Sequence, residues 1–328
     1  MSVGNLYEAI VPVESQGDTE RRQALHKAMW QVLVKLTGDS AIVDDERAKS
    51  LINEAQSYVQ QYRYLESTGD DSVAGLRLWT GFDSAAVNRA LQRLGIATWG
   101  SERPATLIWL AVDGEGGRQL AGMEQAAQYL DPLTRQAQER GLPLLLPLMD
   151  LEDTTRLSPA DIAGGSISTI RDASERYPAD VVLAVSLTGV GGDNISARWT
   201  LLSEEIGNDS WSSDGDSLEA VLSAGINRLA DMLARHYAPR TFAGEATRIE
   251  LTVNAINSLD DYARAQRYLA GLSSVSQVDV VAARPGHVVF GVKATGGGEA
   301  LDQAIAIGRT LRPDNSGAEG GRSYRLLP

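Results

Sequence analysis

Three strongly apolar runs in the middle of the chain constrain its fold more than any other feature. They cover residues 105–112, 142–148 and 179–187, and stretches with helical periodicity separate them. A strand that is buried on both faces needs no polar side chains, so it reads as a continuous apolar run. Such strands alternating with helices predict a partly parallel sheet with helices on both faces.

Further signals complete this middle segment. The glycine cluster Gly114, Gly116, Gly117 is expected to be a loop that leads into a helix ending near Arg140, and a second helical stretch is expected over residues 167–177. A glycine-rich turn at 189–194 predicts a hairpin with a strand over 195–202. Residues 218–237 have the apolar spacing of one long amphipathic helix.

The first segment has the pattern of a smaller α+β unit. A strand over 6–13 precedes a helix that Asp18 opens and Gly38 ends. The next expected elements are a helix over 44–56, strands over 58–65 and 75–82 around a turn at 69–71, and a helix over 84–94.

The last segment predicts the order β-α-β-β-α-β, which is the split βαβ arrangement of ferredoxin-like folds. Its expected elements are residues 247–255, 258–272, 275–283, 287–294, 298–311 and 323–327. Glycine and proline clusters near residues 102 and 243 predict the boundaries. We therefore expect an α/β chain of three small domains, 1–101, 102–243 and 244–328, of α+β type in the two terminal domains.

The net charge of −13 is concentrated in the middle segment. Residues 102–243 have 11 Lys and Arg against 21 Asp and Glu, which gives −10, whereas residues 244–328 have nine of each sign. An acidic surface repels phosphate backbones, so no nucleic-acid partner is expected. Cysteine is absent, which excludes disulfides and thiolate chemistry and is common in oxidising compartments.

No segment of the sequence has the residue spacing of a known catalytic, cofactor-binding or metal-binding motif, so none of these sites is expected. The three histidines have no neighbouring ligand pattern, and the acidic clusters fit first turns of helices better than a calcium loop. The cluster Gly189–Gly192 follows a strand but precedes another strand, so it lacks the helix N-terminus that binds phosphate. No GxxxxGK[ST] or GxSxG motif occurs.

Aromatic side chains are the remaining candidates for a binding surface. Tyr62, Tyr64 and Trp79 fall on one expected hairpin, and Trp199 and Trp211 bracket the last expected strand of the middle segment. Rings in sheets most often pack in a core. The alternative is a partner or ligand surface, where Trp and Tyr are enriched.

No apolar run approaches the roughly 20 residues that a membrane-spanning helix needs. The chain enters its first expected strand soon after Met1, so the start is expected to be that of a mature chain whose secretion signal has been removed.

The run from Leu6 to Val13, the segment Arg21–Leu25 and the segment Val32–Gly38 resemble a proteobacterial family known only as a domain of unknown function. The segments 197–199 and 225–234 are also similar to it, so the resemblance is expected to extend over at least residues 4–240. Members of that family usually have a secretion signal, which implies a periplasmic location. At the level of fold, the first unit is similar to the amino-terminal domain of a periplasmic flagellar-assembly protein. The middle unit is similar to domains of the Tol translocation protein and of penicillin-binding-protein activators.

These resemblances imply a non-catalytic periplasmic adaptor that binds an envelope protein, such as an inner-membrane permease or a cell-wall factor. One alternative is a carrier of a small molecule or lipid with a pocket between domains. A second alternative is a hydrolase whose site is assembled from distant carboxylates. Converging acids of perturbed pKa would favour the hydrolase.

Overall fold

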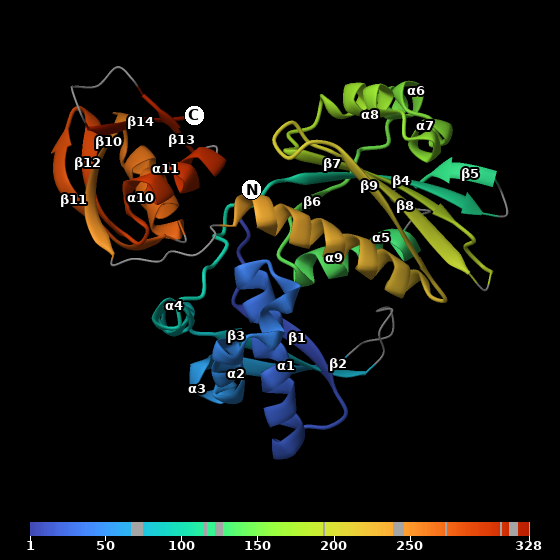
Figure 1. Cartoon of the computed structure of the whole chain (residues 1–328), viewed down its shortest axis with the longest axis horizontal. Helices are drawn as coiled ribbons and strands as arrows, with labels where there is room; N and C mark the ends of the chain where they lie inside the picture. The colour runs from blue at the N-terminus through green and yellow to red at the C-terminus, as the bar shows by residue number, and fades with distance from the viewer. Residues whose placement is uncertain are drawn as a thin grey trace. The chain divides into compact units, whose positions relative to one another are not determined.

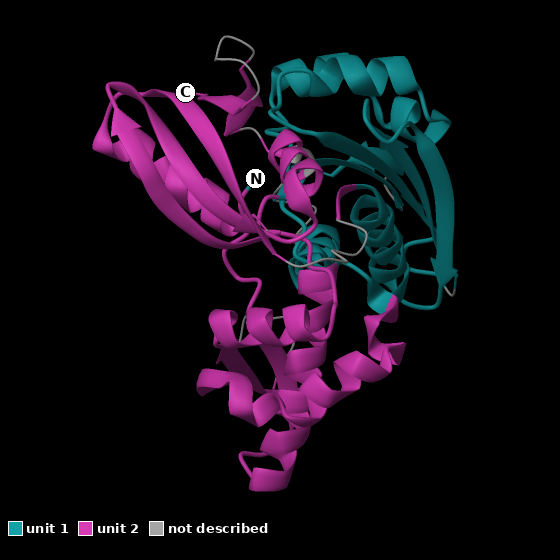
Figure 2. Ribbon diagram, turned by 60° about the vertical axis from the view of Figure 1, so that its left-hand side comes forward, with its two compact units in different colours: residues 1, 38–40, 103–236 teal, residues 2–37, 41–102, 237–328 magenta. Residues whose placement is uncertain are grey.

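The computed structural model describes residues 1–66, 75–114, 117–121, 127–192, 194–238, 246–272, 274–308, 310–314 and 321–327. The chain divides into two compact units. Unit 1 contains Met1, residues 38–40 and residues 103–236, and unit 2 contains residues 2–37, 41–102 and 237–328 (Figure 2). The mixture of helices with mixed and antiparallel sheets confirms the α/β class. Each sheet lies inside one of the three expected ranges, and the boundaries at 101 and 243 stay predictions.

Unit 1 is built on a mixed sheet with the order β5-β4-β7-β8-β9, and β6 pairs with β4 beside this path. β4 runs parallel to β6 and β7, whereas β5, β8 and β9 pair antiparallel with their neighbours. The strands are β4 (Thr106–Gly114), β5 (Gly117–Leu120), β6 (Leu144–Leu145), β7 (Val181–Thr188), β8 (Ile195–Leu202) and β9 (Asp209–Gly215).

Helices cover both faces of this sheet, as the continuous apolar runs predict. Figure 1 shows α6, α7 and α8 on one face and α5 and α9 on the other. On β4, Trp109 and its alternate neighbours pack in a cluster with Ile162 and Ile170 from the first group of helices. The helices are α5 (Ala127–Glu139), α6 (Leu151–Arg156), α7 (Pro159–Gly164), α8 (Ile167–Ser174) and α9 (Leu218–Tyr237).

The structure corrects three expectations in unit 1. The apolar run 142–148 is a strand only over Leu144–Leu145, because Pro143 and Pro147 have no N–H for a ladder and Met149 leaves the strand at φ 55°. The glycine cluster at 114–117, of which 115 and 116 lie outside the described residues, does not lead directly into a helix, because β5 turns back along β4 first. β9 is a strand that the sequence did not indicate.

Unit 2 contains an antiparallel three-stranded sheet with the order β1-β3-β2. Its helices follow the expected order, but the one expected over 44–56 is divided in two at Glu54, after Asp45 caps its start. The expected turn at 69–71 lies outside the described residues. The elements are β1 (Glu8–Val13), α1 (Asp18–Thr37), a 3₁₀ helix (Ser40–Asp44), α2 (Glu46–Asn53), α3 (Ala55–Tyr58), β2 (Val59–Glu66), β3 (Leu76–Phe82) and α4 (Ser84–Arg93).

All four helices contribute to one core on one face of this small sheet. On β1, Ala9, Val11 and Val13 are buried in that core, whereas Ile10 on the opposite face is 44% exposed. The apolar stripe of α1 is buried as its i, i+3, i+4 spacing predicts. The second face of the sheet therefore has no helix of this core packed on it.

Unit 2 also contains a five-stranded sheet with the order β11-β12-β10-β14-β13. The first three strands have the ferredoxin-like arrangement that the sequence predicts. The end of the chain differs, since α11 leads to the edge strand β13 and β14 then turns back to lie parallel to β10. The elements are β10 (Thr247–Ile256), α10 (Leu259–Gly271), β11 (Val275–Arg284), β12 (Gly286–Ala294), α11 (Gly297–Ile307), β13 (Leu311–Pro313) and β14 (Arg322–Leu326).

Among the described residues, no helix has the length and hydropathy needed to cross a membrane.

Candidate functional site

The strand β2 is an edge of the three-stranded sheet, and it is the most exposed strand of that sheet. Within the described part of the chain it pairs with β3 alone. An edge strand presents N–H and C=O groups that another chain can pair with, so natural proteins usually shorten or cover such edges. β2 is eight residues long, and its side chains alternate between the helix-bearing face and the open face.

On the helix-bearing face, two tyrosines of β2 meet an arginine of α1. Tyr62 is 46% exposed, and its ring packs edge-on against that of Tyr64, with the centroids 6.2 Å apart. The Arg21 guanidinium lies 5.7 Å from the Tyr62 centroid. Hydrogen bonds with Tyr64 and with Asp18, whose Oδ1 is 2.6 Å from Arg21 Nη2, raise the pKa of Arg21. These contacts fix the cation beside an exposed ring.

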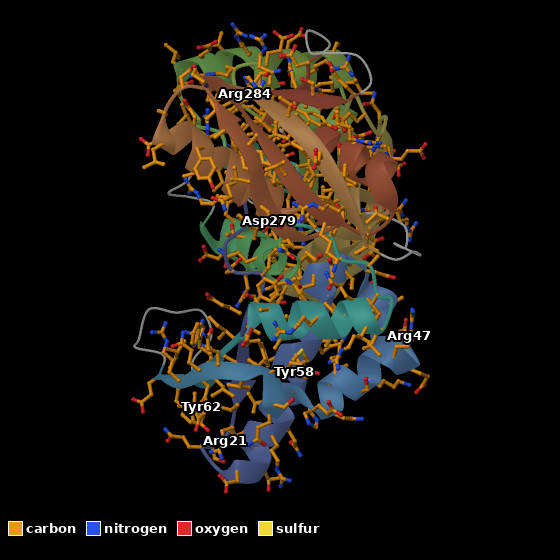
Figure 3. All side chains as sticks on the ribbon, turned by 90° about the vertical axis from the view of Figure 1, so that its left-hand side faces the viewer. Arg21, Arg47, Tyr58, Tyr62, Asp279 and Arg284 are labelled. Atoms are coloured by element: carbon orange, nitrogen blue, oxygen red, sulfur yellow. The ribbon has the colours of Figure 1, made fainter. Side chains whose placement is uncertain are left out.

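An open hollow of ≈ 410 Å³ lies along this side of β2. Arg21 and Tyr62 line it together with Leu25 of α1 and Val59 at the start of the strand, and three glutamines complete the lining. Figure 3 shows Arg21 and Tyr62 close together on this side of the sheet. Because apolar side chains and a cation share one hollow, it suits a partner side chain with both an apolar and a polar part.

On the open face, Trp79 of the central strand β3 lies between β1 and β2. Its Nε1 donates a hydrogen bond to Glu8 Oε2 over 3.3 Å, and the Arg63 guanidinium lies 4.8 Å from the ring. The ring covers Gly81, where a Cβ atom would come within 3.1 Å of it. Ile10 is the register partner of Trp79 on β1 and is largely exposed. The strand β2 therefore has an aromatic–arginine pair on each side.

The β-sheet register explains why the aromatic residues of this hairpin separate. Tyr62 and Tyr64 pair with Thr80 and Leu78, which face the helices, whereas Arg63 pairs with Trp79 on the open face. The sequence therefore predicts that the three rings lie on one hairpin, but it does not predict which face of the sheet each ring occupies. Arg21 was not among the expected site residues, because its contact with Tyr62 joins two elements about 40 positions apart in the sequence.

Residues 1–100, which include this site, match the model of one protein family. That family is described as "Domain of unknown function (DUF8605)". The expected resemblance to a domain of unknown function is confirmed for residues 1–100. From there to residue 240 it stays a prediction.

No curated protein matches the chain. Among solved structures, the LpoB C-terminal domain from Salmonella enterica is similar with 20% identity, over 39% of this chain and 90% of that chain, at a TM-score of 0.23. At so low a TM-score, no property of LpoB transfers to this chain.

The other two candidate aromatic residues lie in the core of unit 1. Trp199 and Trp211 do not bracket a strand but are register partners on β8 and β9, and their rings stack with centroids 6.0 Å apart. Their exposed fractions are 0% and 7%. Trp199 Nε1 donates to Ser213 Oγ over 2.9 Å, which ties the ring to the adjacent strand. Both residues therefore pack the core, and the candidate surface consists of Tyr62, Tyr64 and Trp79 with their arginines.

Among the described residues, each carboxylate whose pKa departs clearly from the ordinary value has a lowered pKa, and each is the N-cap of a helix or lies in its first turn. Arg176 lowers the pKa of Asp150, the N-cap of α6, to about 2. Hydrogen bonds from side chains and backbone N–H groups lower the pKa of the other three, Asp45, Asp161 and Asp261. A lowered pKa suits a helix cap and not the general acid of a hydrolase. The described residues contain no group of three side chains placed to hold a metal ion.

Proposed function

We propose that this chain is a non-catalytic accessory protein of the bacterial cell envelope, located in the periplasm, that binds an envelope protein through β2. An extended segment of the partner adds to the sheet as a fourth strand. The observation that carries the proposal is a long edge strand with an aromatic–arginine pair on each of its two sides. The absence of cysteine and the family resemblance of the first segment support the compartment.

Strand addition accounts for both sides of the site at once. Main-chain hydrogen bonds to an exposed edge provide affinity, and pockets for alternate side chains provide specificity. One partner side chain would enter the hollow beside Tyr62, and the next would lie against Arg63 and Trp79 on the open face. An inner-membrane permease or a cell-wall factor with an unstructured segment is the kind of partner that fits.

In-cell cross-linking with mass spectrometry tests this function. The reagent should link carboxylates, because the chain has 43 Asp and Glu. The double variant Arg21→Gln/Arg63→Gln removes both cations beside β2, and each such contact contributes about 0.5–1 kcal/mol at an exposed site. We expect this variant to recover the partner about five- to thirtyfold less than the unsubstituted chain.

The matched control is Arg22→Gln/Arg89→Gln, which removes two exposed arginines of α1 and α4 and changes the net charge equally. It should recover the partner as the unsubstituted chain does. If no envelope protein is recovered reproducibly, or if both double variants lose it alike, the proposed site is wrong.

A further inference from the structure

In the part of the chain that the structure describes, the five-stranded sheet of unit 2 has helices on one face and none on the other. Figure 1 shows α10 and α11 on the same side of the sheet. The buried residues of the strands, among them Leu251, Val253, Phe290 and Tyr324, form one core with residues of those helices. Alternate residues point to the opposite face, where Arg248, Lys293 and Arg325 are exposed.

One row of side chains crosses this open face over all five strands. Residues that pair directly across strands point to the same face. Arg284 pairs with His287, His287 with Asn254, Asn254 with Arg325, and Arg325 with Arg312. Strands lie about 4.8 Å apart, so the row spans about 19 Å. Figure 3 shows Arg284 on this sheet, at the β11 end of the row.

The row includes two arginines that face each other directly, Arg325 and Arg312. Like charges opposite each other on a sheet are destabilising. Arg325 has a counterion, because its Nε lies 3.2 Å from Oδ2 of Asp314, whose side chain is only 8% exposed and also accepts a hydrogen bond from Asn254. For Arg312 and Arg284 the described residues show no ion pair. Three arginines of the row thus share one described carboxylate, that of Asp314.

A second like-charge pair lies on the same face. Arg248 and Lys293 are register partners on β10 and β12. Arg248 crosses over Gly291, where a Cβ atom would come within 2.8 Å of its Nη2, and reaches to 3.7 Å from Asp279. Among the described residues, this face therefore has five cations, the four arginines and Lys293, against the carboxylates of Glu250, Asp279 and the neighbouring Asp314. Residues 244–328 are neutral in total, so the positive charge is segregated onto the face without helices.

The backbone beside the row is strained. Ala255 has φ 66°, a conformation that residues with a side chain rarely adopt, and it forms a bulge directly after Asn254. Such conformations cost about 1–3 kcal/mol and concentrate at functional sites. The two like-charge pairs on this exposed face are stability costs that a bound anion would offset.

We propose that this face binds an acidic, extended segment of a protein partner, laid across the strands along the row from Arg284 to Arg312. A length of about 19 Å corresponds to about six extended residues, and carboxylates on alternate positions would lie about 7 Å apart. Arginine forks bind carboxylates through paired hydrogen bonds. A segment with few charges also fits the net charge of −13, which repels densely charged polyphosphates and anionic membranes. This inference depends on the five-stranded sheet alone and not on β2.

The test is fluorescence anisotropy of the full chain with a labelled eight-residue peptide that has glutamate at alternate positions. The glutamine version of the peptide, short-chain polyphosphate and phosphatidylglycerol vesicles are the comparison probes. We expect the glutamate peptide to bind, with an affinity that falls as salt is raised. The variant Arg312→Gln/Arg325→Gln should weaken that binding at least about tenfold.

The control Arg89→Gln/Arg267→Gln removes the same charge from exposed positions on α4 and α10, and it should stay within twofold of the unsubstituted chain. Thermal unfolding shows whether the variants fold, and relief of the like-charge pair predicts that Arg312→Gln alone unfolds no earlier than the parent. If the double variant does not fold, Arg284→Gln at the other end of the row should still weaken binding. Absence of peptide binding, equal weakening in both double variants, or preference for polyphosphate or vesicles would overturn the proposal.

Discussion

Replacing Gly225 by alanine is expected to destabilise unit 1 by about 2–3 kcal/mol, the upper part of the range of about 1–3 kcal/mol for overpacking a core. Its thermal midpoint should then fall by roughly 5–10 °C. Gly225 is in α9, where alanine is ordinarily the better helix former by about 1 kcal/mol. A Cβ atom there would come within 1.9 Å of the Trp199 ring. That ring is fully buried, stacked on Trp211 and hydrogen-bonded to Ser213, so it has no room to move.

The loss of stability can be measured by near-UV circular dichroism of the stacked tryptophans and by hydrogen exchange of the β8 amides. The control is Gly164→Ala at the end of α7, where the nearest atom to a new Cβ is Ser166 Oγ at 3.9 Å. It should be neutral or slightly stabilising. If the thermal midpoint of Gly225→Ala equals or exceeds that of this control, α9 does not approach Trp199 as closely as described.

The second large effect is expected at Asp153, the fully buried acid of α6. Its Oδ2 accepts hydrogen bonds from Met149 N over 2.8 Å and from the Tyr177 hydroxyl over 2.5 Å, and its Oδ1 lies 3.1 Å from Arg176 Nη1. Burial and the bond to Asp153 raise the pKa of Tyr177 to about 12. Asp153→Ala would leave two donors, the Met149 N–H and the Tyr177 hydroxyl, without their acceptor, whereas Arg176 would keep its bonds to Asp150. The expected cost is about 3 kcal/mol.

The loop before α6 should respond most strongly to that substitution. Met149 has φ 55°, and the N–H groups of Leu148 and Met149 are held by Tyr177 and Asp153. Without Asp153, exchange of these two amides should accelerate well before unit 1 unfolds globally. Asp172→Ala, the same change at an exposed position of α8, should alter neither exchange nor midpoint by more than about 0.5 kcal/mol. Similar behaviour of the two variants would contradict the role assigned to this network.

The fold was most predictable where periodicity and length agreed. The apolar spacing of α1 and α9 indicated helices with one buried face. The apolar runs that form β4 and β7 indicated strands that are buried on both faces. The sequence predicts a longer strand than β6, because an apolar run does not show that two prolines and the left-handed backbone of Met149 end its hydrogen-bond ladder. β9 was missed since its residues are mostly polar and its burial depends on Trp211 alone.

The candidate site was predictable only in part, for a physical reason. Tyr62, Tyr64 and Trp79 could be identified as unusual rings, but the face that each occupies depends on the bulge between Val59 and Gln61. No local sequence pattern identifies the two arginines that contact these rings. Arg21 reaches Tyr62 from the helix α1, and Arg63 reaches Trp79 on the neighbouring strand. Trp199 and Trp211 have similar local patterns, yet both rings lie against α9, Trp199 at Gly225 and Trp211 at Arg228.

The central claim is that a partner segment pairs with the edge of β2, and site-specific photo-cross-linking in the native cell tests it most directly. A photoreactive side chain would replace Tyr62 on the helix-bearing side, Arg63 on the open side, or Ile10 on the far strand β1. Strand addition predicts the same protein adduct from positions 62 and 63 and little from position 10, because only β2 borders the added strand. Adducts from 10 and 63 without 62 would indicate docking on the flat open face. That result, or no protein adduct from β2 at all, would contradict the account.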